Sequence, residues 1–148
     1  GKRGRGASGK TAVLVACENR EKKAGFIAMK AVDSVNFPNV EEFVNRHLLP
    51  RQRVRTDGYP SLNIINNTQQ HIPKVTPSEL VDEWLPWVHI AIGNLKTFLL
   101  GTFHGVTGKF LQEYLNEFCY RFNRRFVEKE IPNRLLNLAI FHAPIITT

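Results

Sequence analysis

One long apolar run limits how this chain can fold. Between Trp84 and Gly105 the sequence reads WLPWVHIAIGNLKTFLLGTFHG, and its apolar residues fall on every side of a helix. A helix of this composition packs against a core instead of lying on the surface. The run therefore predicts a buried helix within a globular α/β domain.

Two polar residues stand out in this predicted helix. His89 and Lys96 are seven positions apart, so they lie almost in line along the helix, with Gly93 between them. Because burying an unpaired lysine is strongly unfavourable, this strip must face solvent in a cleft or meet an anion. The pattern alone favours an ordinary polar stripe, in which His89 borders the core and Lys96 extends to water.

The first apolar segments predict a β-hairpin. TAVLVAC (Thr11–Cys17) and AGFIAMKAV (Ala24–Val32) are rich in apolar and β-branched residues, and a charged turn, ENREKK, separates them. The first segment is continuously apolar, without alternation. We therefore expect this strand to be covered on both faces.

The next part of the chain alternates between helix and strand signals. Residues 36–50 have apolar positions at helical spacing, with Asn39 as the expected N-cap. Residues 52–56 alternate like a strand, and residues 59–67 suggest another helix that opens at a proline. Residues 70–75 are expected to form an edge strand, since a proline within a strand confines it to an edge.

Asp57 follows the predicted strand of residues 52–56 and precedes Gly58. The carboxyl ends of strands are where α/β sheets commonly keep their functional residues. Asp-Gly is also one of the commonest turn dipeptides, and spacing alone favours a turn residue slightly over a catalytic one.

The C-terminal part of the chain is predicted to be helical. From Thr107 to Phe126, aromatic residues recur every fourth position, which indicates an amphipathic helix with an aromatic stripe in the core. The stripe comprises Phe110, Tyr114, Phe118, Phe122 and Phe126, and the polar residues Gln112, Glu113, Asn116 and Asn123 are expected to face away from it.

The chain is basic, and its charge is clustered. Its 148 residues are 43% apolar, which suits one domain, and they carry a formal net charge of +7. Three basic clusters suggest a polyanion as partner. They are Lys2, Arg3, Arg5 and Lys10; Arg46, Arg51, Arg53 and Arg55; and Arg121, Arg124 and Arg125. The first cluster could equally be a disordered end, and the third could complement a helix dipole.

Several classes of protein are excluded by missing signals. Cys17 and Cys119 form no C-x-x-C pair, so no zinc knuckle or disulfide framework is encoded. No apolar run is long enough to cross a bilayer, and no signal segment opens the chain, so we expect a cytoplasmic protein. Motifs typical of phosphate-binding loops, serine hydrolases and zinc proteases are also missing from the sequence.

Four segments carry a resemblance to a known family. GKRGRGASGKTAVLVACE, VRTDGYPSL, PWVHIAIGNLKTFLLGTFHGV and LQEYLNEFCYRFNRR are similar to the DDE-type transposase domain of bacterial insertion sequences. The resemblance is to the ISXO-like subgroup, whose full-length members carry a zinc ribbon ahead of this domain. It covers nearly the whole chain, 1–148, as a single domain.

The resemblance implies an RNase H-like fold and a metal-dependent nuclease and strand transferase. Asp57 resembles the second catalytic aspartate of the family, and His89 falls where the family places its third metal-site residue. Lys96 falls on the lysine that follows, which would hold a phosphate or base at the transposon end. The implied cofactors are Mg²⁺ or Mn²⁺, bound by Asp57 and His89.

Two departures from the family affect the expected activity. The first aspartate of the family lies on a strand before the glycine-rich opening of this chain, so we expect a domain that is incomplete at its N-terminus. Asp33 follows a different strand and does not take over that role. In addition, His89 is a softer ligand than a carboxylate for magnesium or manganese.

The missing strand is central in RNase H-like sheets. We therefore expect the hairpin and the 52–56 strand to lack a shared neighbour, which leaves unpaired backbone groups and an exposed apolar seam.

The expected function is DNA transposition, with double-stranded DNA as partner and a homo-oligomer as the active form. The main alternative is a truncated, non-catalytic DNA-binding or dimerisation remnant. A nuclease relative acting on RNA–DNA hybrids shares the fold but is less favoured by the EFCYRFNRR segment.

Overall fold

A mixed five-stranded sheet forms the centre of the protein. The computed structural model describes residues 10–20, 22–75, 80–102, 108–124 and 135–144. The order of the strands is β2-β1-β5-β3-β4. They are β1 (Lys10–Asn19), β2 (Ala24–Val32), β3 (Arg53–Thr56), β4 (Gln70–Pro73) and β5 (Leu135–Pro144).

The predicted hairpin is confirmed. β1 and β2 pair in antiparallel orientation, with Ala12 opposite Val32 and Cys17 opposite Ile27. Residues 12–17 of β1 are all buried, and they alternate between the two halves of the core. This strand is therefore covered on both faces, as its continuous apolar sequence predicts. The predicted edge strand is also confirmed, since β4 lies at the far end of the sheet.

The expectation of an unfilled gap beside the hairpin is wrong. β5 lies between β1 and β3, antiparallel to the first and parallel to the second. Its side chains serve both halves of the core, with Leu136 and Leu138 on one face and Ala139 and Phe141 on the other. β5 thus provides the shared neighbour that the hairpin and β3 were expected to lack. The prediction of a helical C-terminal part is correspondingly wrong for residues 135–144, which form β5.

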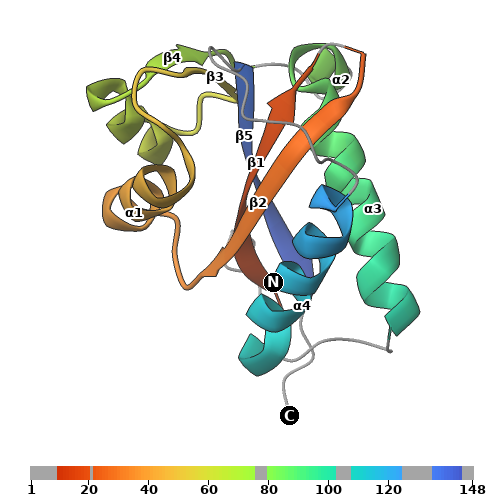
Figure 1. Ribbon diagram of the computed structural model, residues 1–148. Helices are drawn as coiled ribbons and strands as arrows, with labels where there is room; N and C mark the ends of the chain where they lie inside the picture. The colour runs from red at the N-terminus through yellow and green to blue at the C-terminus, as the bar shows by residue number, and fades with distance from the viewer. Residues whose placement is uncertain (1–9, 21, 76–79, 103–107, 125–134, 145–148) are drawn as a thin grey trace.

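Helices cover both faces of the sheet (Figure 1). They are α1 (Phe37–His47), the 3-10 helix η1 (Pro60–Asn67), α2 (Val81–Trp84), α3 (Pro86–Thr102) and α4 (Gly108–Asn123). α1 and η1 pack on one face, and α3 and α4 pack on the other. The N-cap of α1 is Asn36 and not the expected Asn39, because the Asn36 side chain accepts a hydrogen bond from the Asn39 amide at 2.9 Å.

The long apolar run is divided into two helices. α2 ends at Trp84 and α3 begins at Pro86, in keeping with the preference of proline for the first position of a helix. One face of α3 is fully buried through Val88, Ala91 and Leu95, as expected. The helix is not buried all round, because Ile90 and Leu100 are 52% and 70% exposed.

α4 buries the predicted stripe in a modified form. Leu111 and Leu115 are fully buried and Phe118 nearly so, whereas Phe110 is 44% exposed. The core contact therefore runs along the leucines beside the aromatic stripe. Phe126 lies outside the described residues.

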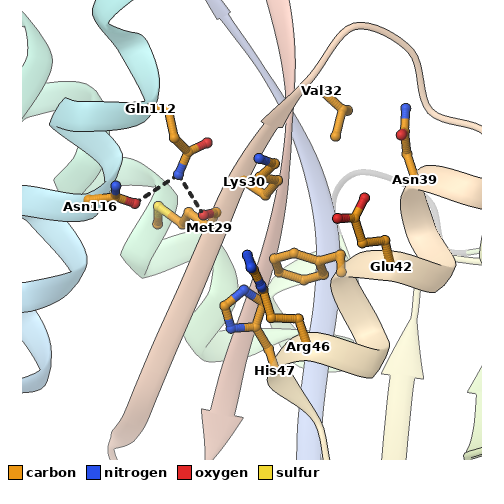
Figure 2. A pocket seen from close by; sticks show the side chains of 10 residues that line it. Met29, Lys30, Val32, Asn39, Glu42, Arg46, His47, Gln112 and Asn116 are labelled. Atoms are coloured by element: carbon orange, nitrogen blue, oxygen red, sulfur yellow. Dashed lines mark hydrogen bonds between the residues drawn. The ribbon is translucent and has the colours of Figure 1, made fainter.

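Side-chain amides of α4 bind the open edge of β2. Asn123 accepts a hydrogen bond from the Ile27 amide at 2.8 Å and donates to the Ile27 carbonyl at 2.9 Å. Gln112 accepts from the Ala31 amide at 2.8 Å. It also donates to the Met29 carbonyl at 3.3 Å, as Figure 2 shows. The prediction that Gln112 and Asn123 face away from the domain is wrong. These side-chain amides occupy the backbone hydrogen-bonding groups on the outer edge of β2. They therefore protect this edge from pairing with a strand of another chain.

Candidate functional site

Asp57 lies directly after β3, at the carboxyl end of the strand. Its Oδ1 accepts a hydrogen bond from the Tyr59 amide at 3.0 Å, and Gly58 has a φ of 84° in the left-handed region. Asp57 is therefore a turn residue. Its second oxygen, Oδ2, makes no hydrogen bond within the described part of the chain. The carboxylate can thus hold the turn with one oxygen and offer the other to a ligand.

The backbone carbonyl of Thr56 connects three elements at this strand end. It accepts hydrogen bonds from the Trp84 indole Nε1 at 2.7 Å and from the Lys74 amide at 3.2 Å. Trp84 ends α2, and a single residue, Leu85, separates it from the start of α3. The start of α3 is consequently attached to the strand end that carries Asp57.

The buried hydroxyl of Thr56 belongs to a second group of hydrogen bonds. His71 Nε2 lies 2.7 Å from Thr56 Oγ1, and His71 Nδ1 lies 2.8 Å from Asn66 Oδ1. Because Asn66 Oδ1 can only accept, Nδ1 carries the proton and Nε2 accepts the hydroxyl proton of Thr56. Thr56 Oγ1 in turn accepts from the Gly58 amide at 3.1 Å. Burial lowers the pKa of His71, which favours this neutral form.

His89 lies in the first turns of α3, five residues after Trp84. Its Nε2 atom is buried. The hydrogen bond between Trp84 and Thr56 places this end of α3 beside the carboxyl end of β3. The structure therefore brings the segments bearing Asp57 and His89 to the same end of the sheet.

Lys96 lies two turns further along α3, roughly 10 Å along the helix axis. Its side chain is exposed, and its Nζ lies 5.4 Å from the centre of the Phe141 ring on β5. Phe141 is three residues beyond Leu138, which pairs with Thr56. Lys96 thus lies farther along the face of the sheet that carries α3, as the spacing of the polar strip predicts.

The described residues do not complete a metal site at this position. No three His, Cys, Asp or Glu side chains come together anywhere within the described ranges. The residue of β5 that follows the partner of Thr56 is Ala139, so the neighbouring strand brings a methyl group and not a carboxylate. Asp33 is exposed at the end of β2, where it accepts a hydrogen bond from Asn39 at 3.2 Å. The donor set in the described part of the chain therefore does not fit a pair of divalent ions.

The predicted DNA-binding residues are only partly within the described ranges. Lys2, Arg3, Arg5 and Arg125 lie outside them, and of Lys10 only the backbone is described. Arg121 pairs with Glu117 at 2.6 Å on the exposed face of α4. The guanidinium of Arg124 lies 5.5 Å from the centre of the Tyr120 ring. The ion pair with Glu117 favours a structural role of Arg121 on α4 over phosphate binding.

A groove of about 270 Å³ lies away from Asp57 (Figure 2). It crosses the edge of β2 between α1 and α4, and Lys30, Arg46 and His47 bring basic groups to it. Burial, and then the charges of Arg46 and Lys30, lower the pKa of His47. Glu42 lines the same groove, so its charge is mixed. The sequence gives no signal for this groove, because α4 is distant along the chain from β2 and α1.

These features define an α/β domain with a mixed sheet, helices on both faces and an acid at the carboxyl end of a strand. The chain belongs to the ISXO2-like transposase domain family, whose model matches residues 1–123. The resemblance noted in the sequence is therefore confirmed. No curated protein and no solved structure gives a significant match. Within the described residues, no helix is both long and apolar enough to span a membrane.

Proposed function

We propose that this chain is the RNase H-like domain of an insertion-sequence transposase and acts on double-stranded DNA at transposon ends. Membership of the transposase family supports this proposal. The observation that carries it is the hydrogen bond of 2.7 Å between Trp84 Nε1 and the Thr56 carbonyl, which joins the start of the His89 helix to the strand end of Asp57.

Asp57 is the residue on which we expect cleavage to depend. Its carboxylate sits on a turn held by the Tyr59 amide and by the hydrogen bonds of Thr56, so its position is fixed before any ligand arrives. In our proposal Asp57 and His89 contribute ligands for Mg²⁺ or Mn²⁺, and Lys96 contacts a phosphate or base of the transposon end.

The ligand set needs at least one more acid from outside the described residues, since no third ligand accompanies Asp57 and His89 there. Transposition joins two DNA ends, so we expect the active form to be a homo-oligomer. We also expect it to act in the cytoplasm.

A nicking assay tests the role of Asp57. Asp57→Asn keeps an oxygen that can accept from the Tyr59 amide, whereas Asp57→Ala removes both the charge and the turn bond. With Mn²⁺ and supercoiled plasmid, we expect the parent to nick DNA and both variants to lose at least about 100-fold in rate, as when a catalytic group is removed. Equal rates in parent and Asp57→Asn would remove Asp57 from the mechanism.

The second candidate function is a non-catalytic DNA-binding module. It is favoured by the finding that the described residues gather no three metal-ligating side chains. In that case the parent and both Asp57 variants would bind DNA with the same salt dependence, and none would nick the plasmid.

A further inference from the structure

A cluster of two cations and one indole lies beside Asp57. The Arg55 guanidinium carbon is 4.8 Å from the centre of the Trp84 ring, and the Lys74 Nζ is 5.1 Å from it. Arg55 belongs to β3, Lys74 follows β4, and Trp84 ends α2. Three elements that are distant along the chain therefore bring two positive charges to one aromatic ring.

The cluster is held in place by hydrogen bonds of its backbone and its indole. The Thr56 carbonyl accepts both from Trp84 Nε1 at 2.7 Å and from the Lys74 amide at 3.2 Å. Arg55 Nη1 donates to the Trp84 carbonyl at 3.4 Å. The Trp84 ring and the side chains of Arg55 and Lys74 that contact it are thus held in place at the end of β3.

The charge of the cluster is not balanced by a carboxylate on Arg55. Within the described residues, Arg55 forms no ion pair, although Asp57 lies two positions further along the chain and Glu83 is adjacent to Trp84. A guanidinium stacked on an aromatic ring keeps its N–H groups free at the edge, where they suit the oxygens of a phosphate. The ammonium of Lys74 adds a second positive charge beside it.

The position of Arg55 relates this cluster to Asp57. Residues two apart on a strand point to the same side and are separated by roughly 7 Å. Asp57 directly follows the last residue of β3, two positions beyond Arg55, so the two residues lie at the same end of the strand. An anion bound by Arg55 would therefore lie next to the carboxylate.

We propose that Arg55 and Lys74, positioned on Trp84, form a binding site for a backbone phosphate of the DNA strand that passes Asp57. This inference rests on the proposed function, since it takes DNA as the polyanion. The phosphate concerned is one that flanks the reacting position, and the cluster sets the path of the strand over the end of β3.

The test is the salt dependence of DNA binding in EDTA, where cleavage plays no part. A short duplex of mixed sequence is titrated with the parent, Arg55→Gln, Lys74→Gln and the double variant. Each single variant should lower the slope of log K against log salt, and the double variant, which loses the one phosphate contact completely, should lower it by about 0.9. Lys30→Gln removes the same charge from an exposed position on β2, at the opposite edge of the sheet from β4, and should leave the slope unchanged.

Urea unfolding of each variant checks that it is folded. Lys74 is exposed, so Lys74→Gln still tests the site if Arg55→Gln fails to fold. If Lys74→Gln and the double variant bind DNA with the same slope of log K against log salt as the parent, the proposed phosphate-binding site is wrong. The proposed function would be unaffected by that result. If the parent binds no DNA, the proposed function fails. In that case a shift of the Arg55 Nε–H resonance on adding inorganic phosphate would still support an anion site, and no shift would overturn it.

Discussion

At the scale of single residues, Thr56 determines how the candidate site is held. Its carbonyl accepts from Trp84 and Lys74, and its hydroxyl lies between His71 and Gly58. Because the side chain is fully buried, water cannot replace these partners. The carboxylate of Asp57 therefore depends on the protonation state of a histidine that touches neither DNA nor metal in our proposal.

We expect this dependence to appear as a loss of stability in mild acid. Burial lowers the pKa of His71 from its usual 6.5 in the folded protein, so the unfolded chain takes up the proton first. Stability is then complete above pH 6.5 and falls as the pH drops below this value. For one half-exposed histidine the fall should stay below about 1.4 kcal/mol per pH unit.

Urea unfolding at several pH values checks this prediction in the parent and in His71→Gln. Since the pKa of His47 is lowered too, His71→Gln should lose only part of the slope, and a His71→Gln, His47→Gln double variant should lose nearly all of it. A slope in His71→Gln identical to that of the parent would show that the bond to Thr56 does not control the titration.

Sequence reasoning singled out only candidate residues whose position has a local signal. Asp57 was selected because it comes directly after a predicted strand. His89 and Lys96 were selected because of their helical spacing within one apolar run. Asn66 and His71 were missed because their contacts with Thr56 depend on how β4 and η1 pack against β3. Such contacts between segments have no periodic signal in the sequence.

At the scale of elements, α4 acts as the lateral partner of β2 as well as a core helix. A single asparagine satisfies both the amide and the carbonyl of Ile27, which is what a neighbouring strand would otherwise do. Amphipathic periodicity predicted α4 correctly, but it assigned its polar side chains to solvent. The sequence cannot distinguish these cases, since amides suit both water and a strand edge.

We expect Asn123→Ala to destabilise the protein by about 1–3 kcal/mol, because it leaves two backbone groups of Ile27 without their partner. Glu113→Ala, at an exposed position on the same helix, should change stability by no more than about 0.5 kcal/mol. Urea unfolding gives both values, and hydrogen exchange at the Ile27 amide should accelerate only in Asn123→Ala. Unchanged exchange there would show that the amide is protected by something other than Asn123.

At the scale of the whole molecule, β5 makes the two halves of the sheet one structure. It pairs with β1 over ten residues and with β3 over four, so within the described sheet it lies between the hairpin and the β3–β4 pair. Sequence analysis missed this strand because residues 135–144 form a short apolar run near predicted helices, and periodicity does not separate a central strand from a buried helix. The α/β class, the hairpin and the edge strand were predictable because each has its own local pattern.

We expect residues 1–148 to unfold in one cooperative transition that requires β5. Leu138→Asp places a charge where the leucine is 1% exposed and should cost more than about 3 kcal/mol. Leu100→Asp, at a position that is 70% exposed, should cost no more than about 0.5 kcal/mol. Circular dichroism during urea unfolding measures both. Similar midpoints for the two variants would show that β5 is not central in solution.

The position of β5 also bears on how the protein is made. This strand is the last of the five to leave the ribosome, yet its neighbours in the sheet are synthesised first. Until residue 144 has emerged, the nascent hairpin exposes an unpaired apolar border that another polypeptide could occupy. Translation rate and chaperone access should therefore govern the yield of native protein more strongly than its final stability does.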